Sequence, residues 1–247
     1  MGIRTIGRGL AAALSLAEFA GGANAGGTVR ACMIDEPPWG SLAAPQHSIY
    51  AEVYAEIAQA TGLDLTISIG PLARSFEDVR TGFCQFTITS WQPARAAEMT
   101  RGAEFSALEF GVYPRLGYAP LDVASLRGHK IAVPRGLLIV PAFDSDVGIS
   151  KVEVYGYEQA VRMTAAGRAD GAAGSIISLR RIIGRLGVVE RFGEPVILNR
   201  VPLALQMNQA FAASEDARRI DGAVAELRQS GKAAQIIARY FDEGLLR

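Results

Sequence analysis

The chain has 247 residues, a length that allows one large domain or two small ones. Hydrophobic residues make up 49% of the sequence and charged residues 20%, which is enough apolar material for a packed core and argues against disorder. The 25 basic and 25 acidic side chains balance, and no basic stripe alternates with aromatic residues, so we expect no nucleic-acid partner. The two histidines, His47 and His129, lie far apart, and the two cysteines form no CxxC pair, so we expect no metal site.

Residues 1–25 have the pattern of a secretory signal peptide. Arg4 and Arg8 precede an apolar run over residues 10–17, and Ala-Asn-Ala follows at 23–25 as a small-residue cleavage site. The alternative is an ordinary mitochondrial-type or buried N-terminal helix, and an acidic residue at position 18 weakens the signal pattern. We expect cleavage after Ala25 and a periplasmic location.

Export would make a disulfide between Cys32 and Cys84 chemically possible. Both cysteines lie in strand-like runs, where buried free cysteines are also common. The sequence therefore leaves the bond open.

The first half of the chain alternates strands and helices. Residues 28–34 form an apolar strand that ends in the turn DEPPWG, and Ser48 and Gly62 are the expected N-cap and stop of a helix. Residues 63–69 alternate as a strand, Ser75 and Gly82 bound a second helix through a capping-box spacing, and residues 83–89 form the next strand. This order predicts a parallel sheet with right-handed crossovers.

The pattern then restarts. Strands are expected to end at Val133, near residue 155 and at residue 175, with helices over 157–167 and 176–187 and a short helical or irregular piece after residue 140. Extended segments at 109–120 and 201–207 connect the two units, and two helices follow over 214–231 and 232–241.

We therefore predict an α/β protein with two lobes, each built on an open, mostly parallel sheet and joined by a two-strand hinge. The first lobe comprises residues 26–110 and 204–247, and the second comprises residues 111–203. Ligands of open α/β sheets lie outside the carboxyl ends of the strands, which here places a ligand in a cleft between the lobes. We expect a monomer.

Six segments in this order resemble the type II periplasmic solute-binding proteins, in particular the small branch that is associated with polar amino acids. They are the opening strand with PPW, RSFEDVRTGFCQFTI, PAR with EFS, LRGHKIAVPRG, AVRMTAAGRADGAAG and LRQSGKAAQIIARYF, and together they span nearly all of the chain after residue 25. The resemblance implies a small-molecule solute, carboxylate or amino-acid-like, and a membrane ABC permease as partner.

The resemblance also implies positions for ligand contacts. Trp39 falls where an aromatic ring covers the ligand, and Ser90 and Gln92 fall where an ammonium group is held. Arg95 falls on the carboxylate-binding arginine, because an arginine fork makes two parallel hydrogen bonds to a carboxylate. The loop that follows Arg95 is longer than usual, so Arg101 is an alternative.

The second lobe departs from the pattern of that branch. Ser175, with Gly174 before it, stands where an acid would pair an α-ammonium group. The expected ligand is therefore a carboxylate or another anion without an amine.

Two further residues are candidates on chemical grounds. Glu36 points toward the mouth of the first strand and could bind a cationic ligand or merely solvate the turn. Arg135 could meet an anion at a helix N-terminus or cover the surface.

An enzyme is not expected. No histidine lies near a serine or cysteine in a recognised spacing, and no glycine-rich dinucleotide loop is present, so we expect no cofactor. A periplasmic sensor or a dehydrogenase-accessory binding protein is an alternative function. A dehydratase of the same fold, with Glu36 as its acid, is a more remote one.

Overall fold

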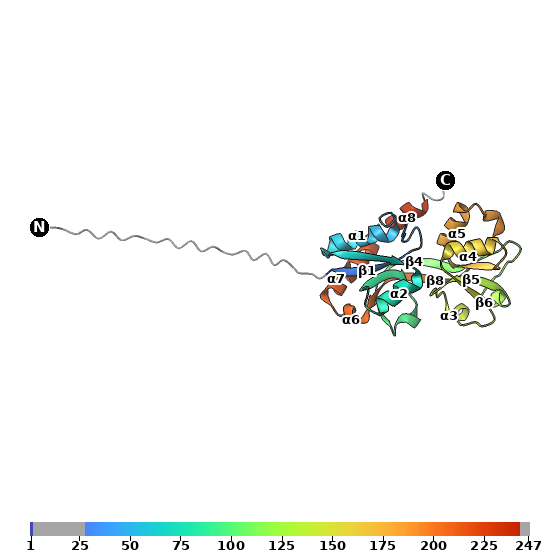
Figure 1. The fold of residues 1–247 in the computed structure, drawn as a ribbon, viewed down its shortest axis with the longest axis horizontal. Helices are drawn as coiled ribbons and strands as arrows, with labels where there is room; N and C mark the ends of the chain where they lie inside the picture. Colours follow the sequence, from blue (N-terminus) through green and yellow to red (C-terminus); the bar gives the residue numbers. More distant parts are fainter. Residues whose placement is uncertain (2–27, 243–247) are drawn as a thin grey trace.

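A computed structural model describes Met1 and residues 28–242, and within this part the chain forms one eight-stranded α/β sheet with helices on its faces (Figure 1). The strand order is β2-β1-β3-β8-β4-β7-β5-β6. The predicted signal peptide at 1–25 lies outside the described stretch from residue 28 onward.

The first lobe contains the three strands at one end of the sheet. Strand β1 (Val29–Ile34) pairs in parallel with β2 (Leu65–Gly70) and with β3 (Phe86–Ser90). The helices of this lobe are α1 (Ile49–Thr61), α2 (Leu72–Arg80), α6 (Gln209–Ala212), α7 (Glu215–Gln229) and α8 (Lys232–Asp242).

The second lobe repeats this arrangement at the other end. Strand β5 (Lys130–Pro134) pairs in parallel with β6 (Ser150–Val154) and with β7 (Gly171–Ser175). Its helices are α3 (Pro141–Asp144), α4 (Tyr157–Ala165) and α5 (Ile176–Arg185), and short 3₁₀ turns lie at η2 (Ala124–Leu126) and η3 (Val189–Arg191).

Two long antiparallel strands join the lobes. Strand β4 (Met99–Pro114) and strand β8 (Val196–Asn208) pair along most of their length, and each also pairs with a strand of one lobe. The two-lobe α/β fold is thus confirmed, and the two predicted sheets are continuous with one another through these strands (Figure 1).

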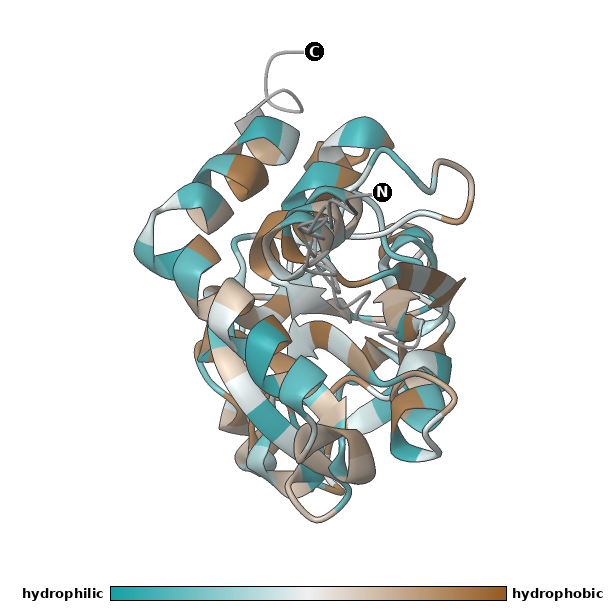
Figure 2. Ribbon diagram, turned by 90° about the vertical axis from the view of Figure 1, so that its left-hand side faces the viewer, coloured by the Kyte–Doolittle hydropathy of each residue, from teal (hydrophilic) through white to brown (hydrophobic). Residues whose placement is uncertain are grey.

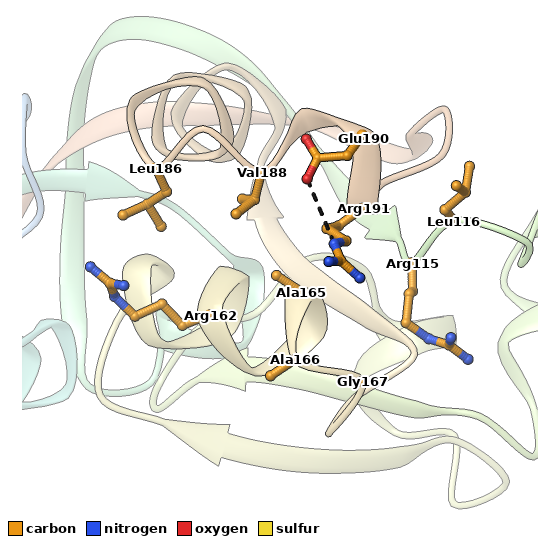
Figure 3. A pocket seen from close by; sticks show the side chains of 10 residues that line it. All are labelled: Arg115, Leu116, Arg162, Ala165, Ala166, Gly167, Leu186, Val188, Glu190 and Arg191. Atoms are coloured by element: carbon orange, nitrogen blue, oxygen red, sulfur yellow. Dashed lines mark ion pairs between the residues drawn. The ribbon is translucent and has the colours of Figure 1, made fainter.

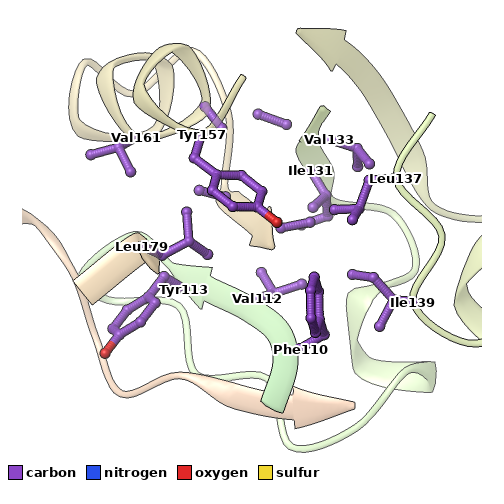
Figure 4. Packing of buried hydrophobic residues seen from close by; sticks show 14 of the residues in the cluster. Phe110, Val112, Tyr113, Ile131, Val133, Leu137, Ile139, Tyr157, Val161 and Leu179 are labelled. Carbon is purple, nitrogen blue, oxygen red and sulfur yellow. The ribbon is translucent and has the colours of Figure 1, made fainter. Parts of the chain in front are cut away.

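Each lobe has its own hydrophobic core. One cluster draws on β1, β3, α1, α7 and α8, and the other on β5, β7, α4 and α5. Figure 4 shows the second cluster, into which the ring of Tyr157 extends. Along the helices, hydrophilic and hydrophobic residues alternate (Figure 2), as expected where one helix face packs on a sheet. Leu72 and Leu108 pack against both clusters and therefore lie where the lobes meet.

Most predicted elements are present, and two boundaries differ. Helix α2 begins at Leu72 rather than after Ser75, because Pro71 fixes its start and the Ser75 hydroxyl instead donates to the Met33 carbonyl oxygen. Strand β4 begins at Met99, within the segment that was expected to be a loop. This segment pairs with β8, and irregularities in the pairing between residues 101 and 106 accommodate its extra residues.

Cys32 and Cys84 form a disulfide, which settles the alternative that the sequence left open. Among the described residues, no helix has the length and apolar character needed to span a bilayer. Within the same part of the chain, no group of three or more histidine, cysteine or acidic side chains could hold a metal ion.

Candidate functional site

A cavity lies between the two lobes, at the carboxyl ends of strands from both. Ile34, Thr89 and Ser90 border it at the ends of β1 and β3, and Pro134 and Ser175 border it at the ends of β5 and β7. Its other lining residues are Asp35, Glu36, Trp39, Tyr50, Leu72, Leu108, Phe110, Leu137, Tyr155, Tyr157 and Leu203. This is the place that the parallel-strand rule predicts for a ligand.

The cavity is small and largely apolar. Its volume is about 40 Å³, and roughly 10–15 Å³ of such space is enough to hold one water molecule. Asp35 and Glu36 are the only charged side chains among its described lining residues. The space therefore accepts a small group, and the ionisable carboxyl groups around it have no basic side chain among the described lining residues.

The DEPPWG turn holds Glu36 and Trp39 at this cavity. The Trp39 N–H donates to the Glu36 carbonyl oxygen at 2.8 Å, and Glu36 and Gly40 form an isolated antiparallel bridge. Gly40 is required here, because a Cβ atom at this position would lie 2.0 Å from the Ile34 carbonyl oxygen. The turn then leads into α1, since the Tyr50 N–H donates to the Trp39 carbonyl oxygen.

Trp39 makes a polar contact across the cleft. Its indole Nε1–H donates to the Ser178 hydroxyl on α5 at 2.9 Å, and that hydroxyl donates to the Ser175 hydroxyl at 3.3 Å. The Trp39 ring packs on Tyr50 with the ring centroids 5.6 Å apart. Two of the predicted ligand residues, Trp39 and Ser175, are therefore brought together through Ser178, which the sequence did not single out.

Glu36 makes a second contact across the cleft. Its Oε2 accepts a hydrogen bond from the Tyr157 N–H, 3.0 Å away, at the N-terminus of α4. Burial raises the pKa of the Glu36 carboxyl from 4.5 to about 8; the Tyr157 N–H opposes this shift, and the nearby Asp35 carboxylate adds to it. The carboxyl is thus held in a place that disfavours its negative charge.

Tyr157 lines the cavity because Gly174 leaves room for its ring. A Cβ atom at Gly174 would lie 2.6 Å from Tyr157 Cε1. The position where the resemblance implied an acid is therefore closed by a tyrosine ring that comes from the neighbouring helix.

We expect Gly174→Ala to lower the free energy of unfolding by about 1–3 kcal/mol, the usual cost of overpacking a core. Gly184→Ala is the matched control on α5, where an added Cβ meets nothing within 4 Å. That change should be neutral or stabilise by up to about 1 kcal/mol, because alanine favours helix. Urea unfolding of both variants measures the difference, and equal effects would contradict the packing role of Gly174.

Ser90 lines the cavity and Gln92 does not, and both make hydrogen bonds within the protein. The Ser90 carbonyl oxygen accepts from Gln206 Nε2 at 3.2 Å. Gln92 Nε2 donates across the cleft to the carbonyl oxygens of Leu138 and Ile139, at 3.1 and 2.9 Å. Gln92 therefore holds the lobes together in this closed arrangement.

Arg95 does not line the cavity. It belongs to η1 (Pro93–Arg95), its guanidinium lies 3.3 Å from the centroid of the Phe76 ring, and its Nη2 donates to the Gly136 carbonyl oxygen in the second lobe at 2.8 Å. Burial lowers the pKa of Arg95 to about 10, and the side chain remains cationic at neutral pH. The alternative residue, Arg101, pairs with Glu104 at 3.4 Å.

Arg135 also lies outside the cavity. It forms an ion pair with Glu153 at 3.0 Å, with 70% of its side chain exposed. The expectation of an anionic ligand relied on arginines, and neither Arg95 nor Arg135 is among the residues that surround this space.

A larger hollow lies at the opposite end of α4 (Figure 3). It is an open groove of about 950 Å³ between the ends of α4 and α5, and it includes Arg115, Arg162 and Arg191. Each of these arginines has an acidic partner, at Asp170, Glu158 and Glu190 respectively. No residue of the first lobe lines this groove, so we place the candidate site at the interlobe cavity.

The fold matches that of several solved structures. A mutant of ArgBP from T. maritima has a TM-score of 0.75 and 16% identity, covering 87% of this chain and 96% of that one. The GluR0 ligand-binding core from Nostoc punctiforme, solved with L-glutamate, has a TM-score of 0.74 and 17% identity, covering 87% and 99%. A histidine kinase sensor domain with similarity to periplasmic binding proteins has a TM-score of 0.73 and 20% identity, covering 86% and 95%.

No protein-family model matches the sequence, and no curated protein matches it. At these identities the likeness establishes the fold. This chain therefore has the two-lobe fold of the type II periplasmic binding proteins.

Proposed function

We propose that this protein is a periplasmic solute-binding protein that encloses a small solute between its lobes and delivers it to an ABC permease. The observation that carries the proposal is the cavity at facing strand ends, where two of its lining residues, Glu36 and Trp39, contact the second lobe. We propose the lobe boundaries given above, residues 26–110 with 204–247 and residues 111–203, and a monomeric state.

Ligand binding should close the lobes further or hold them closed. The two crossings of β4 and β8 can absorb a rotation in a few residues, as hinges do. Small-angle scattering of the protein stripped of ligand by unfolding and refolding should show a smaller radius of gyration after the native solute is added. An unchanged radius at saturation would contradict the mechanism.

The solute itself can be sought by native mass spectrometry of protein purified from its own periplasm. A retained small molecule, lost in Trp39→Ala, would support binding in the cleft. Protein that carries no solute under any growth condition, and that binds none from a metabolite extract, would overturn the proposal.

A sensor role is the second candidate, because a histidine kinase sensor domain is among the similar structures. Neighbouring permease and ATPase genes would favour transport. A neighbouring histidine kinase gene would favour sensing, and an oxidoreductase gene would favour an accessory role.

A further inference from the structure

A more open, acidic groove lies beside the interlobe cavity. The outer groove has a volume of about 530 Å³ and shares Asp35, Glu36, Tyr155 and Tyr157 with the cavity. It adds the carboxylate of Glu158. No lysine, arginine or histidine is among the described lining residues of either space, so their lining favours a positively charged occupant.

The acids around this space differ in how well they are partnered. Glu158 pairs with Arg162 and Arg185, and an oxygen of Asp35 accepts from the Leu42 N–H at 2.9 Å. Glu36 has one hydrogen bond, at Oε2, and within the described part of the chain its Oε1 accepts none. A half-buried carboxylate with one hydrogen bond is only partly compensated, and a cation placed beside it would stabilise its charged form.

Besides the acidic residues, aromatic side chains line the cavity and could contact a cationic ligand. Trp39, Tyr50, Phe110, Tyr155 and Tyr157 all line the cavity. Aromatic ring faces attract ammonium groups, and the attraction is stronger where water is excluded. Tyr155 is 63% exposed, and it lines both spaces, so it lies between the inner cavity and the outer groove.

The two spaces differ in size, so each fits a different part of one ligand. The inner space of about 40 Å³ accepts a group the size of a primary ammonium, whereas the outer groove of about 530 Å³ accepts a larger body. We propose that the solute is an organic amine whose ammonium group pairs with Glu36 among the aromatic rings while its body lies past Tyr155 in the acidic groove. This inference rests on the proposed solute-binding function and assigns its ligand class.

A charge series of matched size tests the ligand class. Calorimetry with n-butylammonium, butan-1-ol and butanoate should show the cation binding most tightly. Glu36→Gln keeps an acceptor for the Tyr157 N–H but removes the charge, and we expect it to weaken n-butylammonium binding roughly 10- to 150-fold. Glu153→Gln, an exposed acid of the second lobe, is the matched control and should leave binding unchanged.

A second variant guards against an indirect effect of Glu36→Gln on folding. Tyr155→Ala changes an exposed side chain and should weaken n-butylammonium binding several-fold without altering the melting temperature. Butanoate binding more tightly than the cation, cation binding that survives Glu36→Gln, or no binding of n-butylammonium at 10 mM would each overturn the inference. Native mass spectrometry separates this failure from that of the proposed function, since a retained anionic or neutral solute would leave a solute-binding protein with a different ligand class.

Discussion

Removing the Cys32–Cys84 disulfide should lower the free energy of unfolding by about 4 kcal/mol. The bond closes a loop with a sequence separation of 52 residues, and the loss of chain entropy in the unfolded state grows with the logarithm of this length. The loop contains α1, α2 and β2, so the cross-link restrains this part of the first lobe in the unfolded chain. Urea unfolding of the mature protein with and without reductant measures the effect.

A double variant separates the cross-link from packing. Cys32 and Cys84 are both buried, in a cluster with Phe76, Val79 and Trp91, so Cys32→Ala with Cys84→Ala also removes packed atoms. This variant should be less stable than the reduced protein, and reductant should have no effect on it. If reduction leaves the urea midpoint of the unmodified protein in place, the entropic account is wrong.

The bond could not be predicted from the sequence because it depends on the sheet order. Strand β1 lies between β2 and β3, and this pairing brings the two cysteine Cα atoms to 5.7 Å. Sequence shows two strand-like runs but not that they are neighbours. The bond is in keeping with an oxidising compartment, where the proposed periplasmic location would place the protein.

Local signals were enough for most helices and strands. Helix α1 has the Ser48 cap and the Gly62 stop that the sequence predicts, with the Ser48 hydroxyl accepting from the Ala51 N–H and Gly62 at φ 64°. At α2 the predicted cap, Ser75, is wrong, because that residue faces the core and the preceding proline decides where the helix starts. Such a choice between two plausible starts depends on packing.

The part of the candidate site that lies at or just after strand ends was predicted from the sequence. Glu36 was expected near the cleft because it follows the first strand, whereas the resemblance to the binding-protein family implied Trp39, Ser90 and Ser175; all four line the cavity. Tyr157 also lines the cavity, although it was not among the residues predicted for the site. Its position depends on the missing side chain of Gly174.

The arginines show the limit of an argument from residue type. Arg95 follows a buried strand, as an anion clamp would, but its guanidinium stacks on Phe76 and binds the Gly136 carbonyl oxygen. Whether an arginine faces a ligand or holds a neighbouring loop depends on where the second lobe lies when the cleft closes. That information is not present in the residues around position 95.

Raising the pH from 5 to 9 should open the lobes. In the closed arrangement burial raises the pKa of Glu36 from 4.5 to about 8, so the closed protein holds a proton that the open protein loses. The groups that face this carboxyl are Asp35 beside it in the turn after β1, Tyr157 and Glu158 on α4, and Arg185 on α5. The raised pKa means that closure is fully favoured below pH 4.5 and is progressively lost up to about pH 8.

The full cost of closure at high pH is on the order of 5 kcal/mol, because the pKa rises from 4.5 to about 8 and each pKa unit corresponds to about 1.36 kcal/mol. Small-angle scattering of ligand-free protein at pH 5 and pH 9 should show a larger radius of gyration at pH 9, and Glu36→Gln should remove this dependence because its amide does not titrate. Glu153→Gln should retain it, since that carboxylate is exposed and pairs with Arg135 outside the cavity. An ammonium ligand that pairs with Glu36 should restore the compact form at pH 9. If the radius is the same at both pH values in the unmodified protein, or if Glu36→Gln still opens at pH 9, the Glu36 carboxyl does not control closure.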